Sequence, residues 1–165
     1  MATNKRFIPT VLALISLGML GTGCGKKKTV VTTQGGQVTM ENSGDKATYE
    51  VKTKEGNFKM TASDKGEISL PDNFPKDVPL YKGAKIKMAT TTGKMMMVMQ
   101  ETKDNAPDVI KFYSDGLKAQ GWEIETTMNM GDMSLVIGKK GKNSCQVTAG
   151  KIPEGTTVQI AVGEE

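Results

Sequence analysis

The stretch that decides the fold is NAPDVIKFYSDGLKAQGW, residues 105–122. Asn105 is a favourable N-cap, and Pro107 suits the first turn of a helix. Apolar residues recur at helical spacing in this stretch, as they do on a helix that buries one face. This stripe consists of Val109, Phe112, Tyr113 and Leu117. Because Gly121 can adopt the left-handed conformation that ends a helix, the sequence predicts one amphipathic helix between Asn105 and Gly121.

Short runs that alternate apolar and polar residues lie on both sides of this helix, as in half-buried strands. Two runs precede it, one beginning at Ile86 and one from Met95 to Gln100. Four follow it, at residues 122–130, 133–138, 143–149 and 156–162. We therefore expect residues 86–165 to form an α+β domain in the order strand, strand, helix and four strands. The helix would lie on one face of an antiparallel sheet.

The preceding residues show shorter and weaker alternation. Residues 38–70 contain four short runs separated by turn signals, which predicts a small β-meander with its last strand at Ile68 to Leu70. Each run has few apolar residues, so this meander should have little core of its own. Residues 71–85 contain three prolines and are interpreted as an extended link. Residues 24–37 are polar and without period, and are interpreted as a tether.

The N-terminus has the three-part layout of a secretory signal peptide. Lys5 and Arg6 provide the charged start, and Phe7 to Leu20 provide the apolar segment. Small residues then lead to Cys24, which predicts a signal peptide over residues 1–23. The apolar segment is shorter than the roughly 20 residues that a membrane-spanning helix needs.

The placement of Cys24 resembles the lipobox of bacterial lipoproteins. The resemblance implies that Cys24 is lipidated, becomes the new N-terminus and holds the protein at a membrane. It departs from the family at Gly21, where leucine is usual. Gly25 stands where an aspartate would favour the inner membrane, so the resemblance implies the periplasmic face of the outer membrane, in a cell that has one.

A second resemblance spans residues 70–163 and covers an uncharacterised group of exported α+β proteins of the bacterial envelope. These proteins carry a stretch FP-x-D-x-P-x-Y-x-G-A and a helix that ends near FY-x-x-x-L-x-x-x-G-W. The matching residues are Phe74, Pro75, Asp77, Pro79, Tyr81, Gly83, Ala84, Phe112, Tyr113, Leu117, Gly121 and Trp122. The resemblance implies a small envelope domain and no particular chemistry.

The composition excludes several classes of function. Lys plus Arg is 22, Asp plus Glu is 18 and histidine is absent, so the chain has no His-based triad and no His-ligated zinc. Without Lys5 and Arg6 of the predicted signal peptide, 20 basic residues stand against 18 acidic ones, and this near balance argues against a nucleic-acid partner. Cys145 alternates with Val147 and Ala149 and is interpreted as a core residue. We expect no catalytic residue and no cofactor, and a non-catalytic binding or structural module whose envelope partner is unknown.

Methionine is the one unusual feature of the composition, with 12 in 165 residues. Thioethers are ligands that Cu(I) and Ag(I) prefer, whereas methionine is also an adaptable filler of cores. Period-two spacing places each of two groups on one face of a strand. These groups are Met95, Met97 and Met99, and Met128 and Met130. The alternative function is therefore periplasmic handling of Cu(I) or Ag(I), if the two strands are neighbours.

Overall fold

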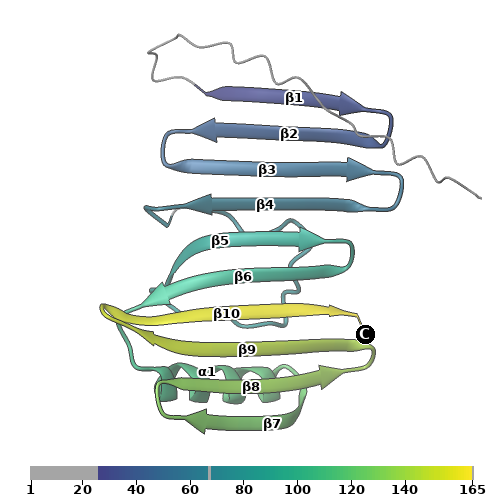
Figure 1. Cartoon of the computed structure of the whole chain (residues 1–165). Coiled ribbons are helices and arrows are strands. Elements are labelled where there is room, and N and C mark those ends of the chain that lie inside the picture. Colours follow the sequence, from purple (N-terminus) through teal and green to yellow (C-terminus); the bar gives the residue numbers. More distant parts are fainter. Residues whose placement is uncertain (1–25, 67, 165) are drawn as a thin grey trace, which may run out of the picture.

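Within the described residues, 26–66 and 68–164 of this computed structural model, ten strands form one antiparallel sheet with one helix against it (Figure 1). The elements are β1 (Lys27–Thr33), β2 (Gly36–Ser43), β3 (Lys46–Thr53), β4 (Asn57–Ser63), β5 (Lys85–Thr92), β6 (Met95–Thr102), α1 (Ala106–Ala119), β7 (Glu123–Met130), β8 (Met133–Lys140), β9 (Asn143–Ile152) and β10 (Gly155–Glu164). The expected mixed α+β class is confirmed.

The order of the strands follows the chain except at one place. Neighbouring strands run β1-β2-β3-β4-β5-β6-β10-β9-β8-β7. The last strand, β10, thus lies between β6 and β9 and pairs with both. In Figure 1, α1 lies behind the β7 to β9 end of the sheet, and β1 to β4 extend away from it.

Helix α1 begins as the sequence predicts. The side chain of Asn105 accepts a hydrogen bond from the Asp108 amide at 3.0 Å, which satisfies one of the free donors of the first turn. At the other end Gly121 has φ of +81°, a left-handed conformation that glycine adopts without strain. The buried stripe differs in one respect, because Ile110 is buried while Phe112 is half-buried. The ring of Phe112 packs edge-on against Tyr81, 5.0 Å away between centroids, rather than against the sheet.

The core lies between α1 and the strands that it covers. Val136, Val147 and Ile160 are fully buried and face one another across β8, β9 and β10 in direct register. Leu117 and Trp122 are buried against them from the helix side. Burying this apolar surface is the main source of stability for this end of the sheet.

The proline-rich segment connects β4 to β5, which are neighbours in the sheet, and passes over α1 on the way. Residues 68–84 form neither strand nor helix, and Phe74 and Val78 within them are buried. The indole Nε1 of Trp122 donates a hydrogen bond to the Asp77 carbonyl oxygen at 3.2 Å. A side chain at Gly116 would approach Pro79 to within 2.9 Å, so the segment lies directly on α1.

Two expectations about the N-terminal region are wrong. Residues 27–33 form β1 and Gly36 begins β2, where we expected a tether. The polar composition concealed these strands, whose backbone groups pair with each other along their whole length. Residues 68–70 are not a strand, because the chain leaves the sheet there and Ile68 is buried in the core. The predicted signal peptide, residues 1–23, and Cys24 lie outside the described residues.

Candidate binding surface

The register of the sheet defines two faces, because residues paired across antiparallel strands point to the same side. We call the face that α1 covers the helix-side face, and the opposite face the open face. Val136, Val147, Ile160 and Val98 are paired in one row and lie on the helix-side face. This row of paired residues continues from Val98 through Ala89 to Thr61 and on to β1. Because side chains alternate along a strand, the row assigns every residue of β1 to β4 to one of the two faces.

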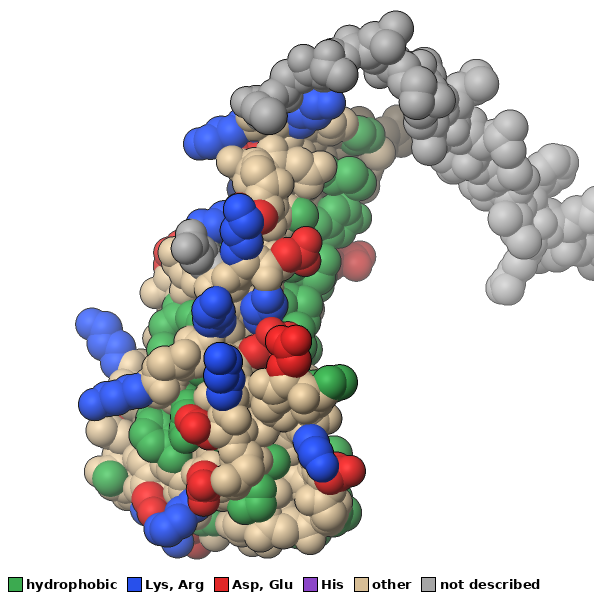
Figure 2. All heavy atoms as spheres, turned by 90° about the vertical axis from the view of Figure 1, so that its left-hand side faces the viewer, with side chains coloured by type: hydrophobic (Ala, Val, Ile, Leu, Met, Phe, Trp, Pro, Cys, Tyr) green, Lys and Arg blue, Asp and Glu red, His purple; other side chains and the backbone are tan. Residues whose placement is uncertain are grey.

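The open face carries most of the exposed apolar residues of β2 to β6. Its apolar members there are Val38, Met40, Ala47, Tyr49, Val51, Phe58, Met60, Ala62, Met88, Met95, Met97 and Met99. All of these side chains are exposed or half-buried, and Met40 and Met95 are about half exposed, at 48% and 55%. In Figure 2 this surface is the green column along the right-hand edge of the upper part of the molecule.

On β2 to β4 charge is confined to the helix-side face, whereas Lys85 on β5 and Glu101 on β6 lie on the open face. Across β2, β3 and β4, which the structure describes in full, the open face carries no charged side chain. The charged residues of β2 to β4 are Glu41, Lys46, Glu50, Lys52 and Lys59, and all lie on the helix-side face. This part of the sheet is therefore amphipathic, with one apolar face and one charged face.

Two aromatic rings lie in the middle of the open face. Tyr49 on β3 and Phe58 on β4 pack edge to face, with their ring centroids 6.1 Å apart and an angle of 63° between the rings. Such a pair is stabilising beyond its buried area. Met60 is directly opposite Tyr49 on the neighbouring strand. The centre of the open face thus has fixed rings beside an adaptable thioether.

Methionines gather on this face along the whole sheet. Within the described residues every methionine except Met96 lies on the open face. Methionine is unbranched and polarisable, so it adapts to irregular apolar partners. A surface rich in methionine is therefore suited to binding an apolar partner.

The helix-side face of β1 to β4 is hollowed. One hollow of about 540 Å³ lies between this face and the segment that begins at Ile68, and a second of about 450 Å³ lies beside it. Lys46, Glu50 and Lys59 line both of them. Glu50 pairs with Lys52 at 3.2 Å across a surface that water reaches, so this charged face is well solvated.

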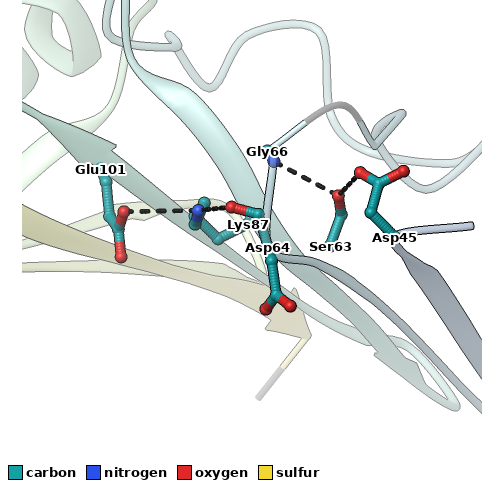
Figure 3. Close-up of polar contacts among 6 residues, drawn as sticks. All are labelled: Asp45, Ser63, Asp64, Gly66, Lys87 and Glu101. Carbon is teal, nitrogen blue, oxygen red and sulfur yellow. Dashed lines mark hydrogen bonds and ion pairs between the residues drawn. The ribbon is translucent and has the colours of Figure 1, made fainter.

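A small polar network fixes the corner where β4 ends (Figure 3). The hydroxyl of Ser63 donates to Asp45 Oδ2 at 2.8 Å, and it accepts a hydrogen bond from the Gly66 amide at 3.3 Å. The hydrogen bond from Ser63 is the main reason why the pKa of Asp45 is lowered below its ordinary value. Gly66 has φ of +74°, so the turn depends on a glycine.

Lys87 connects this corner to the next two strands. It lies at an irregularity in the β5–β6 pairing, between Ile86 and Met88. Its ammonium group donates to the Asp64 carbonyl oxygen and lies 3.7 Å from Glu101 Oε2 (Figure 3). The contacts in this corner hold the β1 to β4 part against β5 and β6, and they belong to the architecture rather than to a reactive centre.

The predicted five-methionine site is not formed. Met95, Met97 and Met99 share the open face of β6, but Met128 and Met130 lie on β7. Three strands, β10, β9 and β8, separate β6 from β7, so the two groups are about 19 Å apart at a spacing of about 4.8 Å per strand. Within the described residues no group of three or more His, Cys, Asp or Glu could hold a metal ion.

Cys145 lies where the sequence places it. It is fully buried on β9, and burial raises the pKa of its thiol to about 12. The thiol therefore stays protonated near neutral pH, whereas a nucleophilic cysteine requires the thiolate. The sequence analysis did not predict the open face as one continuous apolar surface. The period-two methionines of β6 were a signal for it.

Comparison with known proteins finds one family that matches part of the chain. A family described as START domain-like matches residues 85–159, which run from β5 into β10 and exclude β1 to β4. No curated protein and no solved structure matches the chain. Among the residues that the structure describes, no helix is both long and apolar enough to cross a membrane.

Proposed function

We propose that this chain is an exported, lipid-anchored protein of the bacterial envelope that acts without catalysis, as a binding module. Its binding surface is the open face of β2 to β6. The observation that carries the proposal is the segregation of side chains on β2, β3 and β4. Apolar residues including Tyr49, Phe58 and Met60 gather on one face, and charged residues including Lys46 and Lys59 gather on the other.

The composition of the open face supports a protein-binding role. The centres of protein interfaces are enriched in aromatic residues and methionine and depleted in Lys, Glu and Asp. The open face has this composition, and no described segment of the chain covers it. Large exposed apolar patches on monomers mark sites of interaction.

The sequence around Cys24 supports the anchor and the location. The lipobox-like placement of Cys24 directly after small residues, and Gly25 after it, favour lipidation and the periplasmic face of an outer membrane. Cys24 stands three residues before Lys27, where β1 begins. An extended chain of three residues spans about 10 Å, so the anchor would hold the sheet at the membrane surface.

The anchor is tested by metabolic labelling with a clickable fatty acid. We expect label on the unchanged protein, and none on the Cys24→Ala variant, which would also leave the membrane fraction. An unlabelled wild-type protein, or label that persists in Cys24→Ala, would contradict the proposal.

The binding surface is tested by photo-crosslinking in intact envelopes. A photoreactive residue is introduced at Met40 on the open face or at the adjacent Thr39 on the helix-side face. We expect crosslinked products from position 40 and far fewer from position 39. Equal yields from the two positions would refute the assignment of the open face.

A further inference from the structure

The open face of β2 to β6 is an apolar sheet face that no second layer of the described chain buries. An apolar sheet face is stable when another layer buries it. Helix α1 supplies such a layer only at the β7 to β9 end, where it covers the helix-side face. Strands β1 to β4 extend beyond α1 as a single layer (Figure 1). Figure 2 shows the resulting apolar column along the right-hand edge of the upper part of the molecule.

The side chains on this face favour a protein over a lipid occupant. Surfaces that lie on membranes combine apolar residues with Lys and Arg that reach the headgroups. On β3 and β4 the lysines Lys46, Lys52 and Lys59 point to the opposite face. Across β2 to β4 the open face also offers no charge for a charged partner to recognise.

The available area matches that of a stable dimer. The strands β2 to β6 are 7 or 8 residues long. At about 3.4 Å per residue and about 4.8 Å between strands, their open face has a projected area of about 600 Å². Two copies face to face would bury about 1,200 Å² in total, and more when the relief of the side chains is included, against about 1,200–2,000 Å² in stable interfaces.

We propose that the occupant of the open face is a second copy of this chain. Two open faces pack as the two layers of a β-sandwich about 10 Å apart, with their strands aligned to within about 30°. A two-fold axis near β4 brings each open face against itself. The part of this face formed by β2 to β4 carries no charge and is complementary to its own copy, and Lys85 and Glu101, at one end of β5 and β6, carry opposite charges. Tyr49, Phe58 and Met60 then lie at the centre of the interface, where binding energy concentrates.

This inference rests on the open face being the binding surface and is independent of the anchor at Cys24. The test uses adjacent residues of β4 that lie on opposite faces, Met60 and Thr61. Full-length Met60→Cys and Thr61→Cys variants are oxidised in intact envelopes, with the unchanged chain as the control for Cys24 and Cys145. We expect a disulfide-linked dimer from Met60→Cys and none from Thr61→Cys.

A charge at the interface provides the second measurement. Phe58→Cys should crosslink as Met60→Cys does, and adding Met60→Glu to it should weaken the association at least about a hundredfold, since like charges then face each other. Adding Thr61→Glu instead places the same charge on the helix-side face and should leave the crosslink unchanged. Equal loss with both glutamates, or crosslinks from both faces, would overturn the dimer.

A lipid occupant is distinguished by dilution. Full-length Met60→Cys, labelled with an environment-sensitive dye, is reconstituted in phosphatidylcholine vesicles at decreasing ratios of protein to lipid. If a second copy covers the face, the emission of the dye is blue-shifted at high ratios of protein to lipid. It returns to the emission of a dye exposed to water as this ratio falls. A blue shift that persists at the lowest ratio would assign the face to the membrane, and photo-crosslinks only to other proteins would assign it to a different partner. Both results would overturn the dimer, and the second would leave the binding-surface proposal intact.

Discussion

Replacing Tyr113 by phenylalanine removes one oxygen atom from the contact between α1, β6 and the proline-rich segment. Tyr113 is fully buried, and its hydroxyl donates to Gln100 Oε1 at 2.7 Å. The same hydroxyl accepts a hydrogen bond from the Tyr81 amide at 3.1 Å. Gln100 is only 2% exposed, so water cannot replace the lost donor easily. Tyr113→Phe therefore leaves one buried acceptor and one partly buried donor without partners.

The expected cost is large for the loss of a single atom. A buried polar group left unsatisfied costs about 1–3 kcal/mol, so Tyr113→Phe should lower the free energy of unfolding by about 2–4 kcal/mol. Tyr49→Phe is the matched control, because its ring lies on the open face and is half-buried. This control should change stability by less than about 0.5 kcal/mol.

Urea unfolding followed by the fluorescence of Trp122, the only tryptophan, measures both variants. Adding Gln100→Leu to Tyr113→Phe should recover part of the lost free energy of unfolding. The double variant removes the buried Gln100 acceptor that Tyr113→Phe alone leaves without a hydrogen bond. If Tyr113→Phe costs no more than Tyr49→Phe, the hydroxyl does not connect the three elements and the reasoning fails.

Three further predictions concern the same core. The pKa of Cys145 is raised from 9.0 to about 12 in the folded protein, so the unfolded chain loses this proton at a lower pH than the folded one. The free energy of unfolding should therefore fall by up to about 1.4 kcal/mol per pH unit between pH 9 and pH 12. Urea unfolding of Cys145→Ala should show a shallower decline, and an unchanged slope would show that Cys145 is not its cause. Leu117→Ala, at a fully buried position, should cost about 2–5 kcal/mol, whereas a loss below about 0.5 kcal/mol would show that α1 does not pack there. Gly116→Ala places a methyl group 2.9 Å from Pro79 and should lower the melting temperature, although alanine favours helices by about 1 kcal/mol; a higher melting temperature would show that Pro79 yields.

The sequence is informative where local chemistry decides the structure. The cap at Asn105 and the left-handed Gly121 place α1, since both act on the backbone of their own turn. Strand β1 is different, because Val30 and Val31 are adjacent and point to opposite faces, both about half exposed. No alternation marks such a strand, and its existence depends on hydrogen bonds to β2. Ile68 shows the reverse error, an alternating residue whose chain has left the sheet.

The candidate surface could be predicted only in part for a related reason. Period-two spacing correctly placed Met95, Met97 and Met99 on one face of β6. Spacing along one strand does not reveal which strands are neighbours, so the supposed meeting with Met128 and Met130 was wrong. Nor does it reveal which face the helix covers. Both facts depend on pairings between residues far apart in the sequence, such as Met97 with Ala161.

The position of β10 has a consequence for how the protein is made. All strand pairing between β1 to β6 and β7 to β9 passes through β10, which follows every other strand in the chain. During synthesis β10 emerges after all its neighbours, and until then β6 and β9 both present unpaired edges that invite pairing with other chains. Joining the sheet is therefore a late event that depends on contacts distant in sequence, which makes folding slow. The synthesis of β10, rather than the formation of α1, would therefore set the moment at which the ten described strands can form one sheet.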